Sequence, residues 1–495
     1  MQITRLSRSF LALAFLLSCA GAPCALAQLT NPDLKPAPSK YKPKKEDSNA
    51  PTAAPENTAE TKVFGEVPLG PYITRDQARD ILLDVRIVVY SDNAGMTETV
   101  TDPKGKSAQM PVVTPFKFDS MRILFPILRR TASSDLLGTV QPWEDLAGGK
   151  LGYRGRLMFA ERLVDFEPEL LDANSQTSYA AWDFKPAQNE EAREVEIKVQ
   201  YPIRCYATLF DEKAAMNVKW PANWPREAQD AMQPQLYIEQ GLNDAGEIAD
   251  YKKDNITKAV KLFLADQGIK DPKDVPPVRV AKALAGGVWN AVNPTGDGIA
   301  KRKRTSEMMG LTIQAPTSTL EQGTGSPHDM VALLVALLRE AGIPARPVIG
   351  VDIGGRDDKF LSKGSDKRKL HSWVEFYLYD EANKTHNWIP IDIIKMRKST
   401  TRPPKIDQPW RGFGTCPDME AAAPFAVSYQ PPQKGIAAYG AAGFWGWFVT
   451  PETPKHAEQV MTFSAGGVPN RGGDDLTPAT GEPKKDKKSG SKMGR

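Results

Sequence analysis

The feature that most constrains this 495-residue chain is the segment 321–350, EQGTGSPHDMVALLVALLREAGIPARPVIG. Its apolar residues recur at helical spacing from Met330 to Leu338, which predicts a long amphipathic helix. Gly342 stands where helices often end on a left-handed residue, and Pro344 cannot continue the helix. The following sequence PVIGV is typical of a buried strand. We therefore expect a helix that leads directly into a core strand.

Two later segments carry polar side chains that could act together with this helix. In LHSWVEFYLYD, His371, Trp373 and Glu375 share one face of a predicted strand, with Val374 and Phe376 on the other face. A turn at EANKTH leads to NWIPIDII, a second predicted strand that carries Asp392. A helix, a strand with histidine and a neighbouring strand with aspartate give the chain order needed for a helix-borne nucleophile, its base and an orienting acid.

Residues from roughly 234 to 396 resemble the bacterial transglutaminase-like domain, a branch of the papain-like cysteine-nucleophile fold. The matching words are GTGSPHDMVALLVALLREAGIPARPVIG, HSWVEFYL and NWIPID, and it is their order that makes the set specific. The resemblance implies an α+β fold, often preceded by a β-sandwich. It also implies a Cys-His-Asp triad, in which His371 matches the histidine and Asp392 the aspartate.

The position of the family's cysteine, two residues after Gly325 and two before Asp329, is occupied by Pro327. Proline has no nucleophile, no proton to give and no backbone N–H for an oxyanion hole. Ser326 suits a helix N-cap, Pro327 the first helical position and Asp329 the third, so the replacement predicts a well-capped helix start. We therefore expect a non-catalytic protein without a cofactor, whose cleft binds a peptide or protein segment.

Two alternatives keep acyl transfer or peptide hydrolysis. Ser326 would be the nucleophile and His371 its base, although a one-residue shift at a helix start moves a side chain by several ångströms from a contact that must be close. Alternatively, Cys416 in GFGTCPDMEAAAPF would return to the cleft from the C-terminal segment. The structural interpretation of Cys416 is an inert thiol or a disulfide with Cys205.

The sequence favours neither a metal ion nor a nucleic acid as ligand. His328, His371 and Asp392 have side chains that suit zinc, but no close-spaced motif such as His-Glu-x-x-His accompanies them, and we predict no metal site. The net charge is +4, and it falls to +2 if residues 1–27 and their two arginines are removed. A nearly neutral chain gives no electrostatic reason to bind nucleic acid.

The N-terminus predicts an exported protein, periplasmic or extracellular. Residues 1–27 combine two arginines, a short apolar run and an Ala-x-Ala cleavage site, as a secretory signal peptide does. Lipidation at Cys19 is the minor alternative. Residues 28–63 are rich in Pro and Lys, which predicts a disordered tether. The chain has no other apolar run that approaches the length of a transmembrane helix.

The rest of the chain divides by pattern. Period-two alternation in ILLDVRIVVY and REVEIKVQYPIRCYATLF predicts a β-rich, sandwich-like domain at 64–232. Helical spacing then opens the transglutaminase-like domain at 233–400. Residues 401–480 form a C-terminal extension whose Gly/Ala/aromatic patch at 436–448 is either an interface or packs back on the domain. Residues 481–495 form a disordered basic tail.

Overall fold

The computed structural model describes residues 68–91, 97–111, 115–137, 139–140, 152–160, 162–164, 169–172, 178–187, 190–242, 248–250, 253–302, 305–354, 369–430, 442–450 and 457–467. The predicted signal peptide, tether and basic tail lie outside these segments. Within them, no helix combines the length and apolar character needed to cross a membrane.

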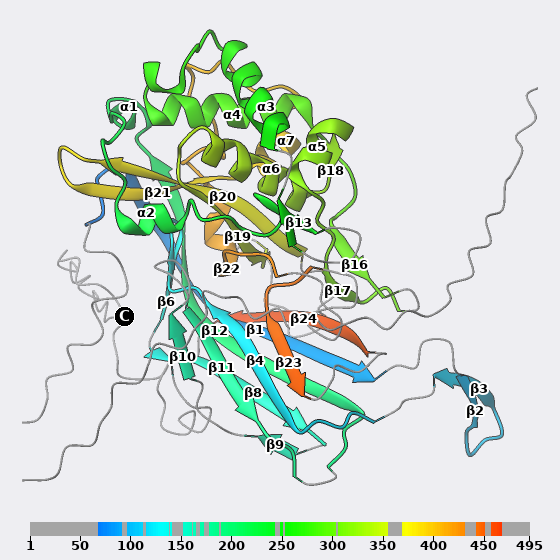
Figure 1. The fold of residues 1–495 in the computed structure, drawn as a ribbon. Helices are drawn as coiled ribbons and strands as arrows, with labels where there is room; N and C mark the ends of the chain where they lie inside the picture. Colours follow the sequence, from blue (N-terminus) through cyan, green and yellow to red (C-terminus); the bar gives the residue numbers. More distant parts are fainter. Residues whose placement is uncertain are drawn as a thin grey trace, which may run out of the picture. The chain divides into compact units, whose positions relative to one another are not determined.

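Two sheets form the β-rich part of the chain (Figure 1). The larger sheet has the order β24–β1–β12–β6–β5, and β8 also pairs with β12 and carries β7 and β9. Its strands are β24 (Ala457–Gly467), β1 (Ile73–Ser91), β12 (Glu194–Phe210), β6 (Ser134–Leu136), β5 (Arg130–Thr131), β8 (Gly152–Phe159), β7 (Thr139–Val140) and β9 (Arg162–Val164). The smaller sheet contains β10 (Glu169–Asp172), β11 (Ser178–Phe184), β4 (Ser120–Ile127) and β23 (Gly446–Thr450), in that order.

The predicted alternation along the long strands is confirmed. In β12, Val195, Ile197 and Val199 are buried while the residues between them are partly exposed. The two sheets pack face to face, and a Cβ atom added to Gly155 of β8 would lie only 2.0 Å from the ring of Trp182 in β11. Glycine at 155 therefore allows the sheets to approach closely.

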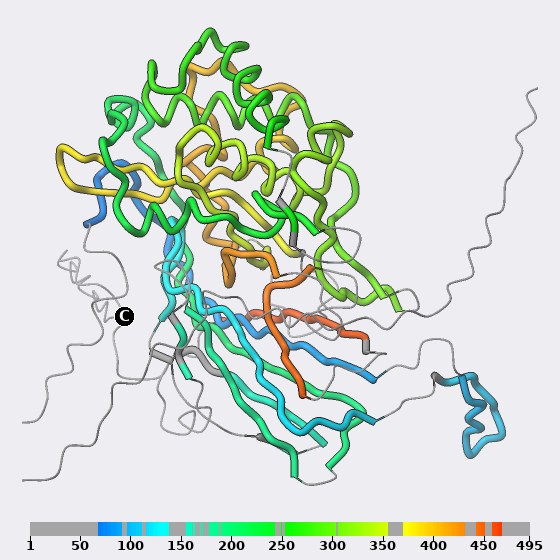
Figure 2. The backbone as a smooth tube through the Cα atoms, viewed as in Figure 1, coloured from blue at the N-terminus to red at the C-terminus, as the bar shows by residue number. Residues whose placement is uncertain are grey.

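The last described strands of the chain, from residue 446 onward, return to the β-rich part. Strand β24 pairs with β1 and β23 with β4, so the red and orange end of the described chain runs beside its blue and cyan beginning (Figure 2). This pairing packs the described aromatic residues of the patch back on the fold, which is one of the two alternatives for this segment. Phe444, Trp445 and Trp447 are buried, and of the four aromatic residues from 444 to 448 only Phe448 is exposed. Residues 436–441 of the patch lie outside the described segments.

The α+β part is built on a four-stranded antiparallel sheet. Its strands, in order, are β21 (Thr385–Ile391), β20 (Lys369–Asp380), β19 (Ala345–Asp352) and β22 (Ala422–Ala426). Its helices are α1 (Glu212–Ala215), α2 (Arg226–Asp230), α3 (Lys253–Ala265), α4 (Pro277–Ala291), α5 (Pro316–Gln322), α6 (Pro327–Glu340) and α7 (Ile393–Ser399), with 3₁₀ turns η3 (Pro272–Asp274) and η5 (Pro417–Ala421). Short two-stranded pairs complete the part: β13 (Gln240–Leu242) with β14 (Ile248–Asp250), β15 (Asn293–Pro294) with β18 (Thr324–Gly325), and β16 (Ile299–Lys301) with β17 (Met308–Leu311). A separate hairpin joins β2 (Thr97–Thr101) to β3 (Ser107–Pro111).

Helix α6 is the centre of this part. It contacts α3, α4, α5 and α7 as well as β19 and β20, and these helices gather on one side of the sheet (Figure 1). Every residue from His328 to Arg339 is buried, so the helix is covered all round rather than on the one predicted face. Its C-terminus is as predicted: Gly342 has φ +83°, and Ile343 N–H donates to Leu338 O at 2.9 Å, which completes a Schellman motif.

Candidate functional site

The start of α6 is a complete capping box, as the sequence predicts. Ser326 is the N-cap and Pro327 the first helical residue. The backbone N–H of Asp329 donates to Ser326 Oγ at 3.2 Å, and Ser326 N–H donates to Asp329 Oδ2 at 2.7 Å. Gln314 N–H donates to the other carboxylate oxygen at 2.9 Å. The oxygen that would serve as a substitute nucleophile is thus a helix cap.

His371 and Asp392 are brought together by neighbouring elements. His371 lies on β20, and its Nε2 atom is 2.9 Å from Asp392 Oδ2. The prediction that Asp392 lies on a strand is wrong. Asp392 follows β21 directly and is the N-cap of α7, where its Oδ1 accepts from Lys395 N–H at 3.0 Å. The imidazole of His371 also packs against the ring of Trp373, with the ring centres 5.6 Å apart and the planes tilted by 30°.

The electrostatics of this pair favour an ionised carboxylate. Asp392 is almost fully buried, and burial alone would raise its pKa. The charge and hydrogen bond of His371, together with Lys395, outweigh burial and lower the pKa of Asp392. A fixed carboxylate beside an imidazole orients the ring, as in catalytic triads.

His328 ties the start of α6 to β20 beside this pair. Its Nδ1 atom lies 2.7 Å from Ser372 Oγ, and its Nε2 atom is buried without a hydrogen-bond partner. Burial, reinforced by the nearby charge of His371, lowers the pKa of His328 to about 4. A neutral histidine therefore joins helix and strand here, and no pattern in the sequence predicts this contact.

Cys416 does come close to the pair, from the loop that precedes η5. Its thiol is buried with Trp373 in a small apolar cluster. Burial first, and then the negative charge of Asp392, raises its pKa, so the thiolate form is disfavoured. Cys416 and Cys205 are both free, which excludes the disulfide alternative.

A comparison with family models assigns this part of the chain. Residues 299–393 match the model of the transglutaminase-like superfamily. This segment is a transglutaminase-like domain. The match includes the start of α6, His371 and Asp392, and it ends one residue into α7. No curated protein sequence matches the chain significantly.

Three solved structures are similar to this chain at low identity. A structure described as a candidate cysteine protease from Cytophaga hutchinsonii is 13% identical with a TM-score of 0.43, and the match covers 82% of this chain and 95% of that one. A candidate protease from Parabacteroides distasonis is 11% identical, with a TM-score of 0.19 and coverage of 65% and 58%. The transglutaminase of red sea bream is 13% identical, with a TM-score of 0.23 and coverage of 72% and 52%. Similarity this remote carries no argument about function, and the domain assignment rests on the family model.

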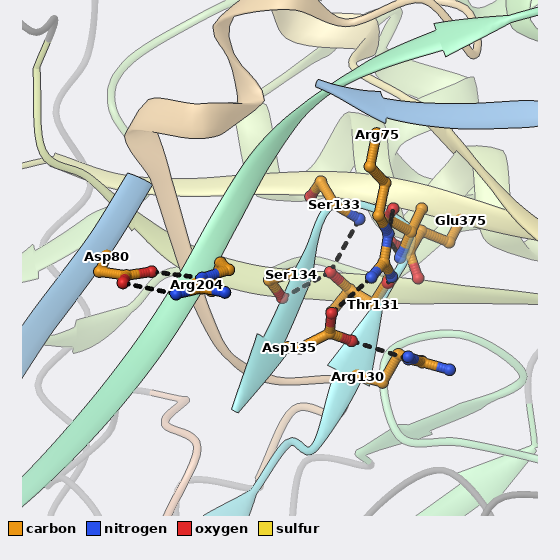
Figure 3. A network of polar contacts seen from close by, with 10 residues as sticks. Arg75, Asp80, Arg130, Thr131, Ser133, Ser134, Asp135, Arg204 and Glu375 are labelled. Carbon is orange, nitrogen blue, oxygen red and sulfur yellow. Dashed lines mark hydrogen bonds and ion pairs between the residues drawn. The ribbon is translucent and has the colours of Figure 1, made fainter. Parts of the chain in front are cut away.

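Glu375, on the same strand as His371, has a role that the sequence did not reveal. It is fully buried, and its Oε2 accepts from Arg346 Nε and Nη2 at 3.0 and 2.7 Å. Its Oε1 accepts from Ala132 N–H at 2.8 Å, in the turn between β5 and β6. Figure 3 shows Glu375 and Arg75 beside this turn, and Arg75 donates to Ala132 O at 2.9 Å and pairs with Asp135 at 2.6 Å. Glu375 thus joins the transglutaminase-like domain to a turn of the β-rich part.

The three side chains considered for zinc, His328, His371 and Asp392, do not form a metal-binding group in the described segments. Across the described segments, no group of three or more His, Cys, Asp or Glu side chains is placed to hold a metal ion. His328 is directed to Ser372, and His371 to Asp392.

Proposed function

We propose that this protein is an exported, non-catalytic member of the transglutaminase-like group that binds a peptide or protein segment. One observation carries the proposal. The residue at the position of the family's cysteine is Pro327, and it begins a helix whose cap is fully formed by Ser326 and Asp329. Proline cannot attack an acyl group, and the capped helix start needs no further explanation.

The experiment that tests the loss of catalysis restores the missing thiol. We expect Pro327→Cys to introduce a thiol at the positive end of α6 and near His371, two features that lower thiol pKa values. Iodoacetamide should label this variant in the native state, and a glutamine-peptide and amine assay should detect acyl transfer that the unaltered protein lacks. Acyl transfer by the unaltered protein would contradict the proposal that the domain is non-catalytic.

A catalytic alternative uses Cys416, because the structure places this residue beside Asp392. This enzyme would be inactivated by Cys416→Ser and by native alkylation. The burial and raised pKa of the thiol oppose this alternative. The acyl-transfer assay of Ser326→Ala, compared with that of the unaltered protein, decides whether Ser326 supplies a nucleophile.

Export is proposed from the sequence of residues 1–27. N-terminal sequencing of the protein recovered from the periplasm or medium should begin at residue 28. Recovery of a lipid-modified N-terminus at Cys19 would support the lipoprotein alternative instead.

A further inference from the structure

We propose that the loop 409–418 forms a second site beside the His371–Asp392 pair, for a peptide segment that carries an apolar side chain next to an acidic group. The inference rests on the proposed peptide-binding function and names the class of peptide. Two hollows meet at this loop and share Arg411 and Pro417 in their walls. Neither wall includes His371 or Pro327, but Asp392 and Cys416 line the second hollow, so the site adjoins the His371–Asp392 pair.

The first hollow has a volume of about 440 Å³ and is mainly apolar. Its wall includes three aromatic rings and two prolines: Phe210, Trp410, Phe413, Pro409 and Pro417. The rings of Phe210 and Phe413 lie 6.2 Å apart, which holds this wall together. An apolar side chain moved from water into such a hollow is stabilised by the hydrophobic effect.

Two carboxylates line this hollow: Asp211, whose Oδ1 accepts from Ala214 N–H as the cap of α1, and Glu212, which has a buried cation behind it. The ammonium group of Lys282 is fully buried, forms an ion pair with Glu212, and donates to Gln408 O at 2.6 Å. It also lies 4.9 Å from the centre of the Trp410 ring. Because Lys282 compensates the charge of Glu212 from the interior, this carboxylate does not exclude an acidic ligand from the hollow.

The second hollow has a volume of about 340 Å³ and supplies positive charge. Lys395, Lys398 and Arg411 line it together with Asp392 and Asp418. Asp392 is already engaged by His371, and Asp418 lies 3.3 Å from Arg411. In the described part of the chain, no carboxylate lies within ion-pair distance of Lys398, which is exposed on the last turn of α7. Lys398 is therefore available to a carboxylate of a ligand.

The charge of the surrounding chain agrees with an acidic ligand. Residues 392–418 contain six Lys and Arg and three Asp, a local net charge of +3. Because the two hollows share wall residues, one extended segment can place an apolar side chain in the first hollow and an acidic group in the second. Charge complementarity of this kind selects a ligand more than it adds affinity.

Fluorescence anisotropy with the full chain and three labelled peptides tests the inference. The first peptide carries one Trp and a run of Glu in a Gly/Ser background, the second has Gln in place of Glu, and the third has Ala in place of Trp. We expect the first peptide to bind about tenfold more tightly than either of the others. Added salt should weaken its binding, because exposed charges are screened beyond about 10 Å at 0.1 M.

Charge-reversal variants locate the site. Lys398→Glu and Arg411→Glu should each weaken binding about fivefold or more. The matched control is Lys258→Glu, because Lys258 is an exposed lysine of α3 away from both hollows, and it should bind normally. Circular dichroism melting confirms that each variant is folded.

Three results would overturn the inference. Equal binding of the Glu and Gln peptides removes the acidic specificity, and absent binding removes the site. Binding that is abolished by Pro327→Trp but unchanged in Lys398→Glu and Arg411→Glu would place the peptide in the original cleft. That last result leaves the proposed function intact, whereas turnover of any of the peptides by the unaltered protein contradicts the proposed function itself.

Discussion

His371 Nε2 and Asp392 Oδ2 lie 2.9 Å apart in a domain whose helix α6 starts with proline instead of a nucleophile. The carboxylate has two structural duties, because its other oxygen caps α7 through Lys395 N–H. Stability alone therefore gives a reason to keep this pair. The pair can be retained in the absence of any reaction.

Asp392→Asn tests this structural role. We expect the free energy of unfolding at pH 7 to fall by about 1–3 kcal/mol, because the charged hydrogen bond to His371 is lost while an amide oxygen can still cap α7. The measurement is urea denaturation followed by circular dichroism. Unchanged stability would show that the pair is not structural.

The pH dependence of the same variant follows from the lowered pKa of Asp392. A lowered pKa stabilises the folded state above the unfolded pKa of about 3.9, and the stabilisation is lost as the pH falls through the folded pKa. The difference in unfolding free energy between the unaltered protein and Asp392→Asn should therefore narrow below pH of about 4. A constant difference down to acid unfolding would contradict the assignment.

Ser326 is expected to act as a helix cap and nothing more. Ser326→Ala should lower the unfolding free energy by about 1 kcal/mol, whereas Ser326→Gly, the matched control, should cost only a few tenths. Thermal or urea unfolding measures both. If Ser326→Ala and Ser326→Gly destabilise the protein equally, the cap is not the source of the stabilisation.

His328 should make the protein sensitive to mild acid. Its pKa is about 4 in the folded state and about 6.5 when unfolded, so the unfolded state binds a proton first as the pH falls. The contribution of neutral His328 to the free energy of unfolding is fully present above a pH of about 6.5. It decreases toward pH 4, by on the order of 3 kcal/mol in total. We expect urea midpoints of His328→Gln to vary less between pH 7 and pH 4.5 than those of the unaltered protein.

Glu375 is expected to be critical for stability. Glu375→Ala leaves Arg346 buried without its partner, and loss of one member of a buried pair typically costs about 3–5 kcal/mol. Glu169→Ala, which breaks the exposed pair of Glu169 with Arg122, should cost less than about 1 kcal/mol. Guanidinium unfolding of the two variants measures the contrast, and similar losses would contradict it.

Local patterns predicted the elements that carry the site. The periodicity of α6, the capping residues at its start and Gly342 at its end were all legible because each depends on neighbouring residues. The burial of α6 on every side cannot be predicted in this way, because the four helices and the sheet that enclose it come from distant parts of the chain. The sequence pattern places Asp392 on the strand, whereas it is the cap of the next helix. The pattern cannot separate the two, because β21 and the cap of α7 adjoin without a break.

Contacts between distant segments left no signal in the sequence. The pairing of His328 with Ser372, and of Glu375 with a turn more than two hundred residues earlier, depends on tertiary structure alone. The same is true of the aromatic residues near 445, whose composition is compatible with an interface or with a core. Their burial was decided by the pairing of β23 with β4.

Strand β24 pairs with β1 from Ile81 to Ser91, although nearly four hundred residues separate them. Strand β1, the first long strand of the described segments, therefore lacks one of its two neighbours until residues 457–467 have been synthesised. Domains that fold from the N-terminus during synthesis do not face this delay. In this chain, the β-rich part and the segment after the transglutaminase-like domain must be completed together. A truncation before residue 457 therefore removes the edge strand β24, which is the neighbour of β1 in the larger sheet.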